Sequence, residues 1–209
     1  MSGEDKHSII RLKPKVSPDK ILAGFPWVYD NELVLDRRTK QLTSGKIVEL
    51  QDSARNFLAT AVVNPKSKIF ARVITKTANK IEGSDLVFKR ISAAKALREG
   101  IFTDPYYRLI NSEADQMPGT IIDRFGDFFV IQPNSVWAEN NLDNIIGMIH
   151  IKDLVKYQNE GRKENKFLDI IKREVLEIPP SMPVLDLLLK MQITRLHMGI
   201  VIDLSLIHI

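Results

Sequence analysis

Four charged residues lie close together in the sequence and are the first candidates for chemistry. Arg108, Glu113, Asp115 and Asp123 supply one cation and three carboxylates, the residue types that general acid–base catalysis uses. A Pro-Gly turn falls among them, between two segments rich in charged residues. We therefore favour a structural interpretation over a catalytic one: Arg108 pairs with a carboxylate, and the group fixes the geometry of the turn.

Three features of the composition restrict the chemistry further. The chain contains 0 Cys, which excludes disulfides, thiolate metal sites and a cysteine nucleophile. Its 4 His residues have no spacing typical of metal ligands. None of its 10 Gly residues forms a Gly-x-Gly pair, so no glycine-rich loop for a nucleotide-like cofactor is predicted.

The length and charge of the chain indicate a folded protein with a basic first part. A chain of 209 residues with 44% hydrophobic and 27% charged composition can fold as one medium domain or two small ones. No apolar run reaches the ~18 residues of a membrane helix and no secretory signal opens the chain, so we expect a cytoplasmic protein. Residues 1–138 hold 21 Lys and Arg against 16 Asp and Glu, net +5, whereas residues 139–209 hold 9 against 10, net −1. The basic excess favours a polyanion partner for the first part.

The first part of the chain is predicted to be mostly β-structure with one helix. Residues 46–50, 57–63 and 69–75 are short β-branched runs between turn-forming residues, a pattern typical of a small barrel. An amphipathic helix should follow, capped by Ser84, ended by Gly100, and buried through Val87, Ile91, Ala94 and Leu97. Residues 107–110, 120–123 and 128–132 then predict a set of antiparallel strands.

The pattern changes near Trp137 to alternating strands and helices. Residues 147–151 predict a buried strand, residues 152–154 the start of a helix, and Phe167, Leu168 and Ile171 a short second helix. Ser181 should cap a third helix, whose apolar residues are Val184, Leu185, Leu188, Leu189 and Met191. Residues 198–202 form an apolar run typical of a strand covered on both faces. The fold class is therefore α+β.

Three ordered motifs in residues 8–135 resemble one known family. They are residues 24–29 (GFPWVY), 64–73 (NPKSKIFARV) and 107–127 (YRLINSEADQMPGTIIDRFGD). Together they resemble the S-adenosylmethionine-dependent methyltransferases that modify cytosine C5 in 23S ribosomal RNA. The resemblance implies a PUA-like β-barrel over residues 8–78 and a small α/β linking domain over residues 79–136.

The resemblance to this family implies docking to ribosomal RNA. Trp27 would offer a stacking face, and Lys66, Lys68, Arg72 and Arg108 would contact RNA. For Trp27 alone we favour a place in the hydrophobic core, because a lone Trp in an apolar run is more often buried. For Lys66, Lys68 and Arg72, phosphate contact and simple solvation remain equal alternatives.

Methyl transfer itself is not expected of these residues. C5 of cytosine becomes reactive only after a nucleophile adds to C6, and the family uses a cysteine thiolate for that step. This chain has none. We therefore expect no bound cofactor, although S-adenosylmethionine serves the family, and we expect the chain to be inactive by itself.

Residues 139–203 are similar to a different family, the paired CBS domains of hemolysin C and of CorC-like magnesium/cobalt efflux proteins. The matching motifs are residues 141–154 and 178–203. This resemblance implies an incomplete CBS module over residues 139–209, with adenine-nucleotide contacts from Asp153, Thr194 and Arg195. Adenine-nucleotide sensing is thus the alternative function, and self-association through the unfinished module is an accompanying expectation.

The two resemblances meet across residues 137–144 without a Gly-, Ser- or Pro-rich linker. Natural fusions usually join whole domains through an exposed linker, so we expect the join to be an artefact of the reading frame. A third interpretation follows, in which the encoded protein has no function and folds poorly beyond residue 135. Its unfinished strands would then leave sheet edges open to association.

Overall fold

The computed structural model describes residues 8–77, 83–149 and 175–202, which fall into two compact units. The first unit covers Met1–Lys80 and the second Ile81–His208, with Ile209 grouped with the first. Each unit has its own five-stranded sheet. The mixed α+β class predicted from the sequence is confirmed, whereas the expected boundary between residues 136 and 139 falls inside the second unit.

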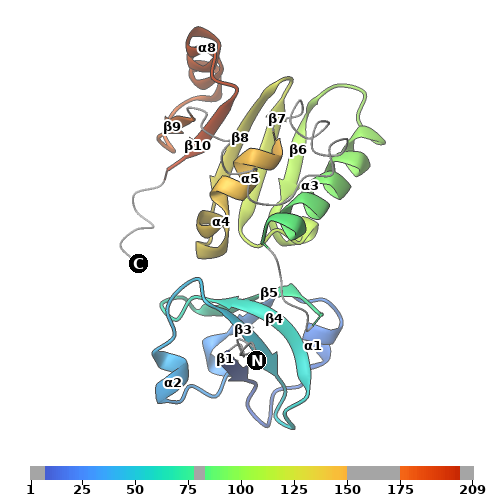
Figure 1. The fold of residues 1–209 in the computed structure, drawn as a ribbon, viewed down its shortest axis with the longest axis vertical. Helices are drawn as coiled ribbons and strands as arrows, with labels where there is room; N and C mark the ends of the chain where they lie inside the picture. The colour runs from blue at the N-terminus through green and yellow to red at the C-terminus, as the bar shows by residue number, and fades with distance from the viewer. Residues whose placement is uncertain (1–7, 78–82, 150–174, 203–209) are drawn as a thin grey trace, which may run out of the picture. The chain divides into compact units, whose positions relative to one another are not determined.

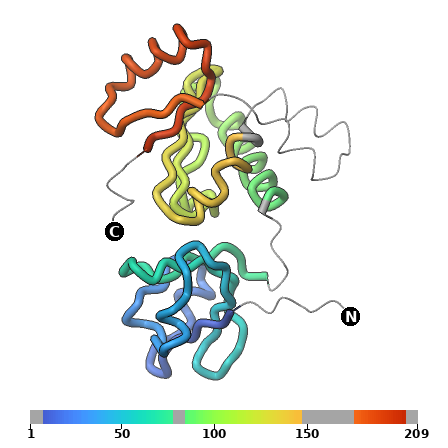
Figure 2. Tube along the Cα trace, turned by 60° about the vertical axis from the view of Figure 1, so that its left-hand side comes forward, coloured from blue at the N-terminus to red at the C-terminus, as the bar shows by residue number. Residues whose placement is uncertain are grey.

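The first unit is a small barrel (Figures 1 and 2). Its strands are β1 (Ser8–Arg11), β2 (Trp27–Tyr29), β3 (Ile47–Gln51), β4 (Phe57–Val63) and β5 (Ile69–Thr75), in the order β1-β3-β4-β5-β2. The β1–β3 pair is parallel and the other pairs are antiparallel. A bridge between Leu12 and Leu33 joins the chain after β1 to the chain after β2, so the sheet closes on itself. This confirms the barrel predicted from the three later strands.

The barrel core is built from the inward-facing residues of every strand. Ile10, Val28, Leu50 and Phe70 are each at most 2% exposed, and Ile21 of the short helix α1 (Asp19–Leu22) joins them at 1%. Two further short helices lie in the connections, η1 (Asp30–Glu32) and α2 (Arg37–Lys40). These elements within residues 8–40 were not predicted, because strands and helices of three or four residues are too short to show a period.

The second unit begins with α3 (Gly83–Glu99), which packs against an antiparallel meander. The meander consists of β6 (Tyr106–Asn111), β7 (Thr120–Phe125) and β8 (Phe128–Pro133), with the short helix η2 (Ser112–Asp115) between β6 and β7. The predicted helix and strands are confirmed here, but α3 begins at Gly83, so Ser84 lies within its first turn and not at the N-cap. Val87, Ile91 and Ala94 are buried as expected, whereas Leu97 is 57% exposed.

The chain after β8 forms α4 (Val136–Asn140) and α5 (Leu142–Ile149). The structure therefore contradicts the strand predicted over residues 147–151, at least through Ile149. The helix buries the two residues just before the predicted strand: Ile145 is 0% and Ile146 5% exposed. α5 contacts α3, and in Figure 1 both lie over the same face of the meander. The helices predicted at residues 152–154 and near 167–171 lie outside the described residues.

Two parallel strands extend the meander. β10 (Met198–Val201) pairs with β8, and β9 (Leu176–Ile178) pairs with β10, so the second sheet runs β6-β7-β8-β10-β9. The predicted strand at 198–202 is confirmed and β9 was missed. Residues on both sides of the suspected join at 137–144 thus contribute to one sheet.

The helix α8 (Val184–Thr194) connects β9 to β10, and only some of its apolar residues are buried. Leu187 and Met191 pack with Leu176 and Ile178, whereas Leu185 is 81% and Leu189 57% exposed. Pro183, not Ser181, occupies the N-cap position, and no side chain caps the helix. Of the five apolar residues that the sequence placed on this helix, Met191 is buried and Val184, Leu185 and Leu189 are exposed. Among the described residues, no helix is long and apolar enough to cross a membrane.

Candidate RNA-binding face of the barrel unit

The positive charge of the chain is concentrated on the barrel unit. Residues 8–77 contain 13 Lys and Arg against 6 Asp and Glu, net +7, while residues 83–149 contain 6 against 9, net −3. A net +7 on about seventy residues is a much stronger polyanion signal than the chain average of +4. The barrel unit is therefore the part in which to look for a nucleic-acid site.

One face of β2 combines aromatic rings with cations. Phe25, Trp27 and Tyr29 alternate along the chain, so they share one side of the strand, while Val28 between them is 0% exposed and points into the core. The rings of Phe25 and Trp27 meet edge to face, with centroids 5.9 Å apart. Phe25 is 40% exposed. The three rings thus form a partly open aromatic surface over the barrel.

Two cations lie on this surface. Arg72 on β5 is the register partner of Trp27, and its guanidinium carbon lies 5.7 Å from the centre of the indole ring. The Nζ atom of Lys20 lies 5.3 Å from the Phe25 ring and 5.6 Å from the Tyr29 ring, and it also pairs with Glu32. We call these five residues, Lys20, Phe25, Trp27, Tyr29 and Arg72, the aromatic–cation patch. Cations over ring faces keep both groups oriented at the surface.

The core position predicted for Trp27 is wrong. Trp27 is only half-buried, and the core position of β2 belongs to Val28. An inward-facing residue and its outward-facing neighbours alternate along a strand, so a short apolar run such as Pro26-Trp27-Val28 need not be buried throughout. This placement leaves Trp27 beside Arg72, a residue that the sequence also singled out.

Lys66 and Lys68 lie in the turn between β4 and β5, and both are exposed. The turn is fixed by Asn64, whose side-chain oxygen accepts hydrogen bonds from the Lys66 N–H (3.2 Å) and the Ser44 hydroxyl (3.1 Å). The Lys68 carbonyl accepts from the Asp30 N–H at 3.0 Å. The backbone is thus held, and the two ammonium groups extend into solvent.

Arg108 lies in the second unit and is paired with a carboxylate, as the structural interpretation predicted. Its Nε and Nη2 donate to the two oxygens of Asp123 at 2.9 and 3.1 Å across the β6–β7 pair. The hydrogen bond to Asp123 raises the pKa of Arg108. The side chain remains 49% exposed, so a further contact is sterically open.

The other carboxylates of this region also have structural partners. The Asp115 carboxylate accepts hydrogen bonds from both Nη atoms of Arg98 at 2.7 Å and from the Asn111 N–H at 2.6 Å. The Ser112 hydroxyl donates to Glu113, and Arg90 donates to the Gln116 carbonyl. Burial lowers the pKa of Arg90 to about 10. The charged cluster thus joins α3 to the loop between β6 and β7, which explains it without catalysis.

The residues expected to bind adenine nucleotide are only partly described. Asp153 lies outside the described residues. Thr194 and Arg195 lie at the C-terminal end of α8, where the Thr194 hydroxyl donates to the Lys190 carbonyl at 2.8 Å and Arg195 adopts a left-handed conformation with φ +55°. His197 stacks on Phe128 with ring centroids 5.3 Å apart. No group of three or more metal-ligating side chains occurs in the described part of the chain.

Sequence reasoning missed Lys20, Phe25 and Tyr29. The signal was present, because Phe25, Trp27 and Tyr29 occupy every second position around a single buried valine. The missing step was to apply the two-residue period to a run interrupted by Pro26. Lys20 gave no signal, because its place beside the rings depends on how α1 packs.

Comparison with known proteins defines the class of the barrel unit: residues 10–76 match the family model of the PUA-like domain. The chain is also similar to curated relatives that carry the name ribosomal RNA large subunit methyltransferase I. It is 33% identical to that of Photobacterium profundum over 129 residues, 60% of this chain and 32% of the relative. It is 30% identical to that of Klebsiella pneumoniae over 173 residues, 78% of this chain and 42% of the relative.

Two solved structures share the fold. One, from Streptococcus mutans, is described as a candidate SAM-dependent methyltransferase; it superposes with a TM-score of 0.58 at 18% identity, over 71% of this chain and 38% of that one. The other, a candidate methyltransferase complexed with SAH, gives 0.57 at 18% identity, over 72% and 38%. The curated relatives and the PUA-like match support the resemblance of the first part of the chain to ribosomal-RNA large-subunit methyltransferases. These findings do not support the CBS resemblance of residues 139–203, which stays a prediction.

The chain spans about a third to two fifths of the length of these relatives. One of the two solved structures is named for SAM dependence and the other is complexed with SAH. The described strand-to-helix turns of this chain are therefore compared with the requirements of a SAM site. The turn from β8 to α4 is closed by Ser135, whose hydroxyl donates to the Pro118 carbonyl at 2.7 Å and accepts from the Ala138 N–H at 3.2 Å. The turn from β9 to α8 contains three prolines, Pro179, Pro180 and Pro183, which have no N–H to offer. Neither of these two strand-to-helix turns therefore offers the free N–H groups that hold the phosphates of a nucleotide-like cofactor.

Proposed function

We propose that this chain is an RNA-binding portion of a protein similar to the ribosomal-RNA large-subunit methyltransferases, and that its ligand is 23S-like ribosomal RNA. The observation that carries the proposal is the aromatic–cation patch on the barrel unit. Unpaired RNA bases stack on aromatic rings and on guanidinium planes, and their phosphates pair with Lys and Arg. Both kinds of group lie side by side on β2 and β5.

The geometry of the patch suits a single strand rather than a duplex. Trp27 and Tyr29 lie on β2, on either side of the buried Val28, and β2 is held by β5, so ordering these two rings costs little conformational entropy on binding. Arg72 lies over Trp27 and Lys20 lies near Phe25 and Tyr29. Lys66 and Lys68, exposed at the β4–β5 turn of the same unit, add phosphate contacts.

The proposal assigns RNA binding, and not methyl transfer, to these residues. C5 methylation in the family that the sequence resembles needs a cysteine thiolate, and this chain encodes 0 Cys. The target base, the RNA segment and the cytoplasmic location stay predictions.

Fluorescence anisotropy of the full chain with labelled single-stranded fragments of large-subunit ribosomal RNA tests the proposal. We expect Trp27→Ala to weaken binding by about tenfold, since stacking contributes ~1–3 kcal/mol per base. Arg72→Gln should reduce the slope of log affinity against log salt by about one phosphate contact. Tyr106→Ala, which removes a 68% exposed ring, and Lys89→Gln, which removes an exposed cation on α3, are the matched controls.

Equal losses in the patch variants and their controls would contradict the patch as the binding site. Salt-independent binding, or no binding to any fragment, would contradict the function itself. Circular dichroism on each variant separates unfolding from loss of contact.

The competing hypothesis is adenine-nucleotide sensing by the CBS-like residues 139–203. It requires Asp153, Thr194 and Arg195 to meet one ligand, yet the Thr194 hydroxyl is already bonded to the α8 backbone. Calorimetric titration of the full chain with ATP tests it, because heat that disappears in Arg195→Ala would favour sensing. Self-association of this part stays a prediction that the protein concentration dependence of sedimentation checks.

A further inference from the structure

A second cluster of cations in the barrel unit surrounds a cavity rather than a flat face. The cavity has a volume of about 700 Å³ and lies where β1, α2 and the start of β3 come together. Arg11, Arg38 and Lys46 line it, together with one carboxylate, that of Asp36. None of the aromatic–cation patch residues takes part.

The single carboxylate can offset at most one of the three cations, and as the N-cap of α2 it is held by hydrogen bonds at the start of that helix. Oδ1 of Asp36 accepts from the Thr39 N–H at 2.7 Å and from the Thr39 hydroxyl at 2.9 Å. These bonds lower the pKa of Asp36. Within residues 8–77, none of Arg11, Arg38 and Lys46 lies within ion-pair distance of a carboxylate. The cavity therefore keeps an excess of positive charge.

Arg11 is held by a hydrogen bond to Gln51 and still has N–H donors without an acceptor in the described part of the chain. Its Nη2 donates to the Gln51 side-chain oxygen at 3.4 Å, and the Gln51 amide in turn donates to Glu49 at 2.7 Å. Its Nε is buried and has no acceptor in the described part of the chain. A guanidinium oriented by a neighbouring strand and not saturated by acceptors is suited to bind an oxyanion.

The rest of the lining combines three neutral polar residues, Ser8, Thr39 and Gln41, with three apolar ones. Ile9 is 41% and Val34 42% exposed, and Leu42 lies beside them. Exposed apolar side chains next to unneutralised cations match a ligand with a flat apolar part and a phosphate, which is the composition of a nucleotide. The volume also suits one such unit, since small-ligand pockets measure ~300–1,000 Å³.

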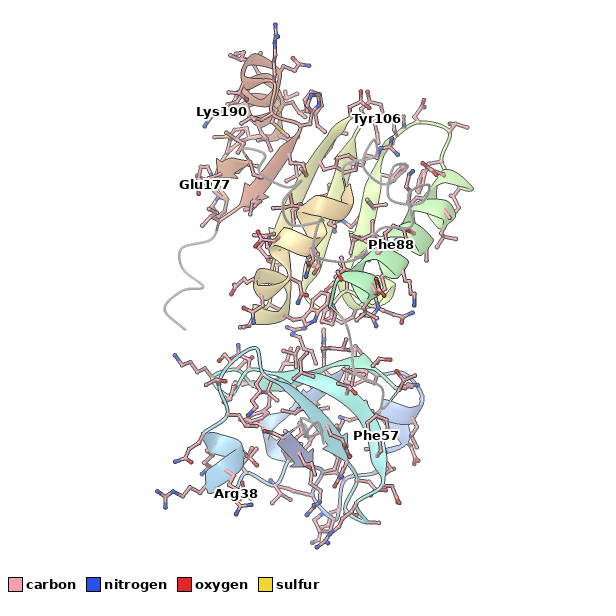
Figure 3. All side chains as sticks on the ribbon, viewed as in Figure 1. Arg38, Phe57, Phe88, Tyr106, Glu177 and Lys190 are labelled. Atoms are coloured by element: carbon pink, nitrogen blue, oxygen red, sulfur yellow. The ribbon has the colours of Figure 1, made fainter. Side chains whose placement is uncertain are left out.

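We infer that this cavity binds the phosphate group of one nucleotide unit, with Arg11, Arg38 and Lys46 contacting the phosphate and Ile9 and Val34 packing on the base. The phosphate belongs either to an RNA strand or to a free nucleotide. Figure 3 labels Arg38 on α2, where its side chain extends from the helix. The inference goes beyond the proposed RNA-binding face, because the two sets of residues are separate.

Calorimetric titration of the full chain at low salt with uridine 5′-monophosphate, and with uridine as the phosphate-free control, tests the inference. A parallel anisotropy titration uses a labelled short oligouridine. The variant is Arg38→Glu, and its matched control is Arg37→Glu, the same charge reversal on the neighbouring residue of α2, which does not line the cavity. We expect Arg38→Glu to weaken binding of the phosphate-bearing probe by about tenfold or more and Arg37→Glu by less than about twofold.

Each outcome decides the inference. Binding of the monophosphate, but not of uridine, that is lost in Arg38→Glu identifies a free-nucleotide site. No monophosphate binding, with a selective loss of oligouridine affinity in Arg38→Glu, identifies an RNA phosphate. Equal effects of the two reversals, or no effect of Arg38→Glu on either probe, overturn the inference. Oligouridine affinity that falls in Trp27→Ala but not in Arg38→Glu leaves the RNA-binding face standing without the cavity.

Discussion

Arg98 on α3 and Asp115 in η2 form a bidentate salt bridge, in which each Nη atom lies 2.7 Å from a different carboxylate oxygen. The side chains are only 14% and 10% exposed, so water screens the pair poorly. The same Asp115 accepts the Asn111 N–H, which ties the end of β6 to the pair. The helix and the turn between β6 and β7 are thus fastened at one point.

Replacing Arg98 by Met should lower the free energy of unfolding by about 3 kcal/mol, because it leaves a buried carboxylate without its charge partner. Arg108→Met removes a second bidentate pair, with Asp123, whose side chains are 49% and 30% exposed. This control should cost no more than about 1 kcal/mol. Urea unfolding followed by circular dichroism measures both, and equal losses would show that burial of the Arg98 pair contributes nothing.

Gly119 should tolerate no side chain. Its φ is +63°, and a Cβ would overlap Ser135, the residue that caps α4. Gly119→Ala is expected to lower stability by about 2 kcal/mol or more. Gly126→Ala shares nearly the same positive φ, +66°, but its Cβ would meet only the Tyr106 hydroxyl oxygen, at an ordinary 3.8 Å. The difference between the two in thermal unfolding isolates the overlap from the backbone strain, and a smaller loss for Gly119 would count against the close packing of the turn on α4.

The two apolar sides of α8 should respond differently to truncation. Met191 is 0% exposed and packs in the cluster with Leu176 and Ile178. Met191→Ala should cost about 2–4 kcal/mol, as for other buried large side chains. Leu185→Ala, on the 81% exposed side of the same helix, should change stability by less than about 0.5 kcal/mol. If chemical denaturation shows no effect of Met191→Ala, residues 176–201 do not fold onto β8.

The stability contributed by Asp36 should depend on pH in a defined direction. Hydrogen bonds from Thr39 lower the pKa of Asp36 below its ordinary 3.8. A carboxylate with a lowered pKa in the folded state stabilises the fold above the unfolded pKa, and this contribution is lost as the pH falls through the folded pKa. Asp36→Ala should therefore lower the midpoint temperature of thermal unfolding at neutral pH. The difference in midpoint temperature between the variant and the parent protein should disappear well below pH 3.8. A difference that is constant with pH would assign the effect to something other than the charged cap.

The sequence predicted the long and strongly patterned elements and missed the short ones. β3, β4, β5 and the meander β6–β8 were predicted from short β-rich runs between turn residues, and α3 from apolar residues at helical spacing. The strand expected at 147–151 was wrong because a continuous apolar run of five residues fits a buried strand and a helix equally well. In the candidate site, Lys66, Lys68 and Arg72 were named from the motif that contains them. Lys20, Arg11 and Arg38 were not, because their positions depend on contacts between segments far apart in the chain.

The bridge between Leu12 and Leu33 has a consequence for how the barrel unit meets a partner. A closed barrel leaves no row of unused backbone N–H and C=O groups along that seam. An extended peptide or a second copy therefore cannot join the sheet there by adding a strand. A partner that docks at this seam has to be recognised by side chains, so specificity there can change by point substitution without refolding the barrel.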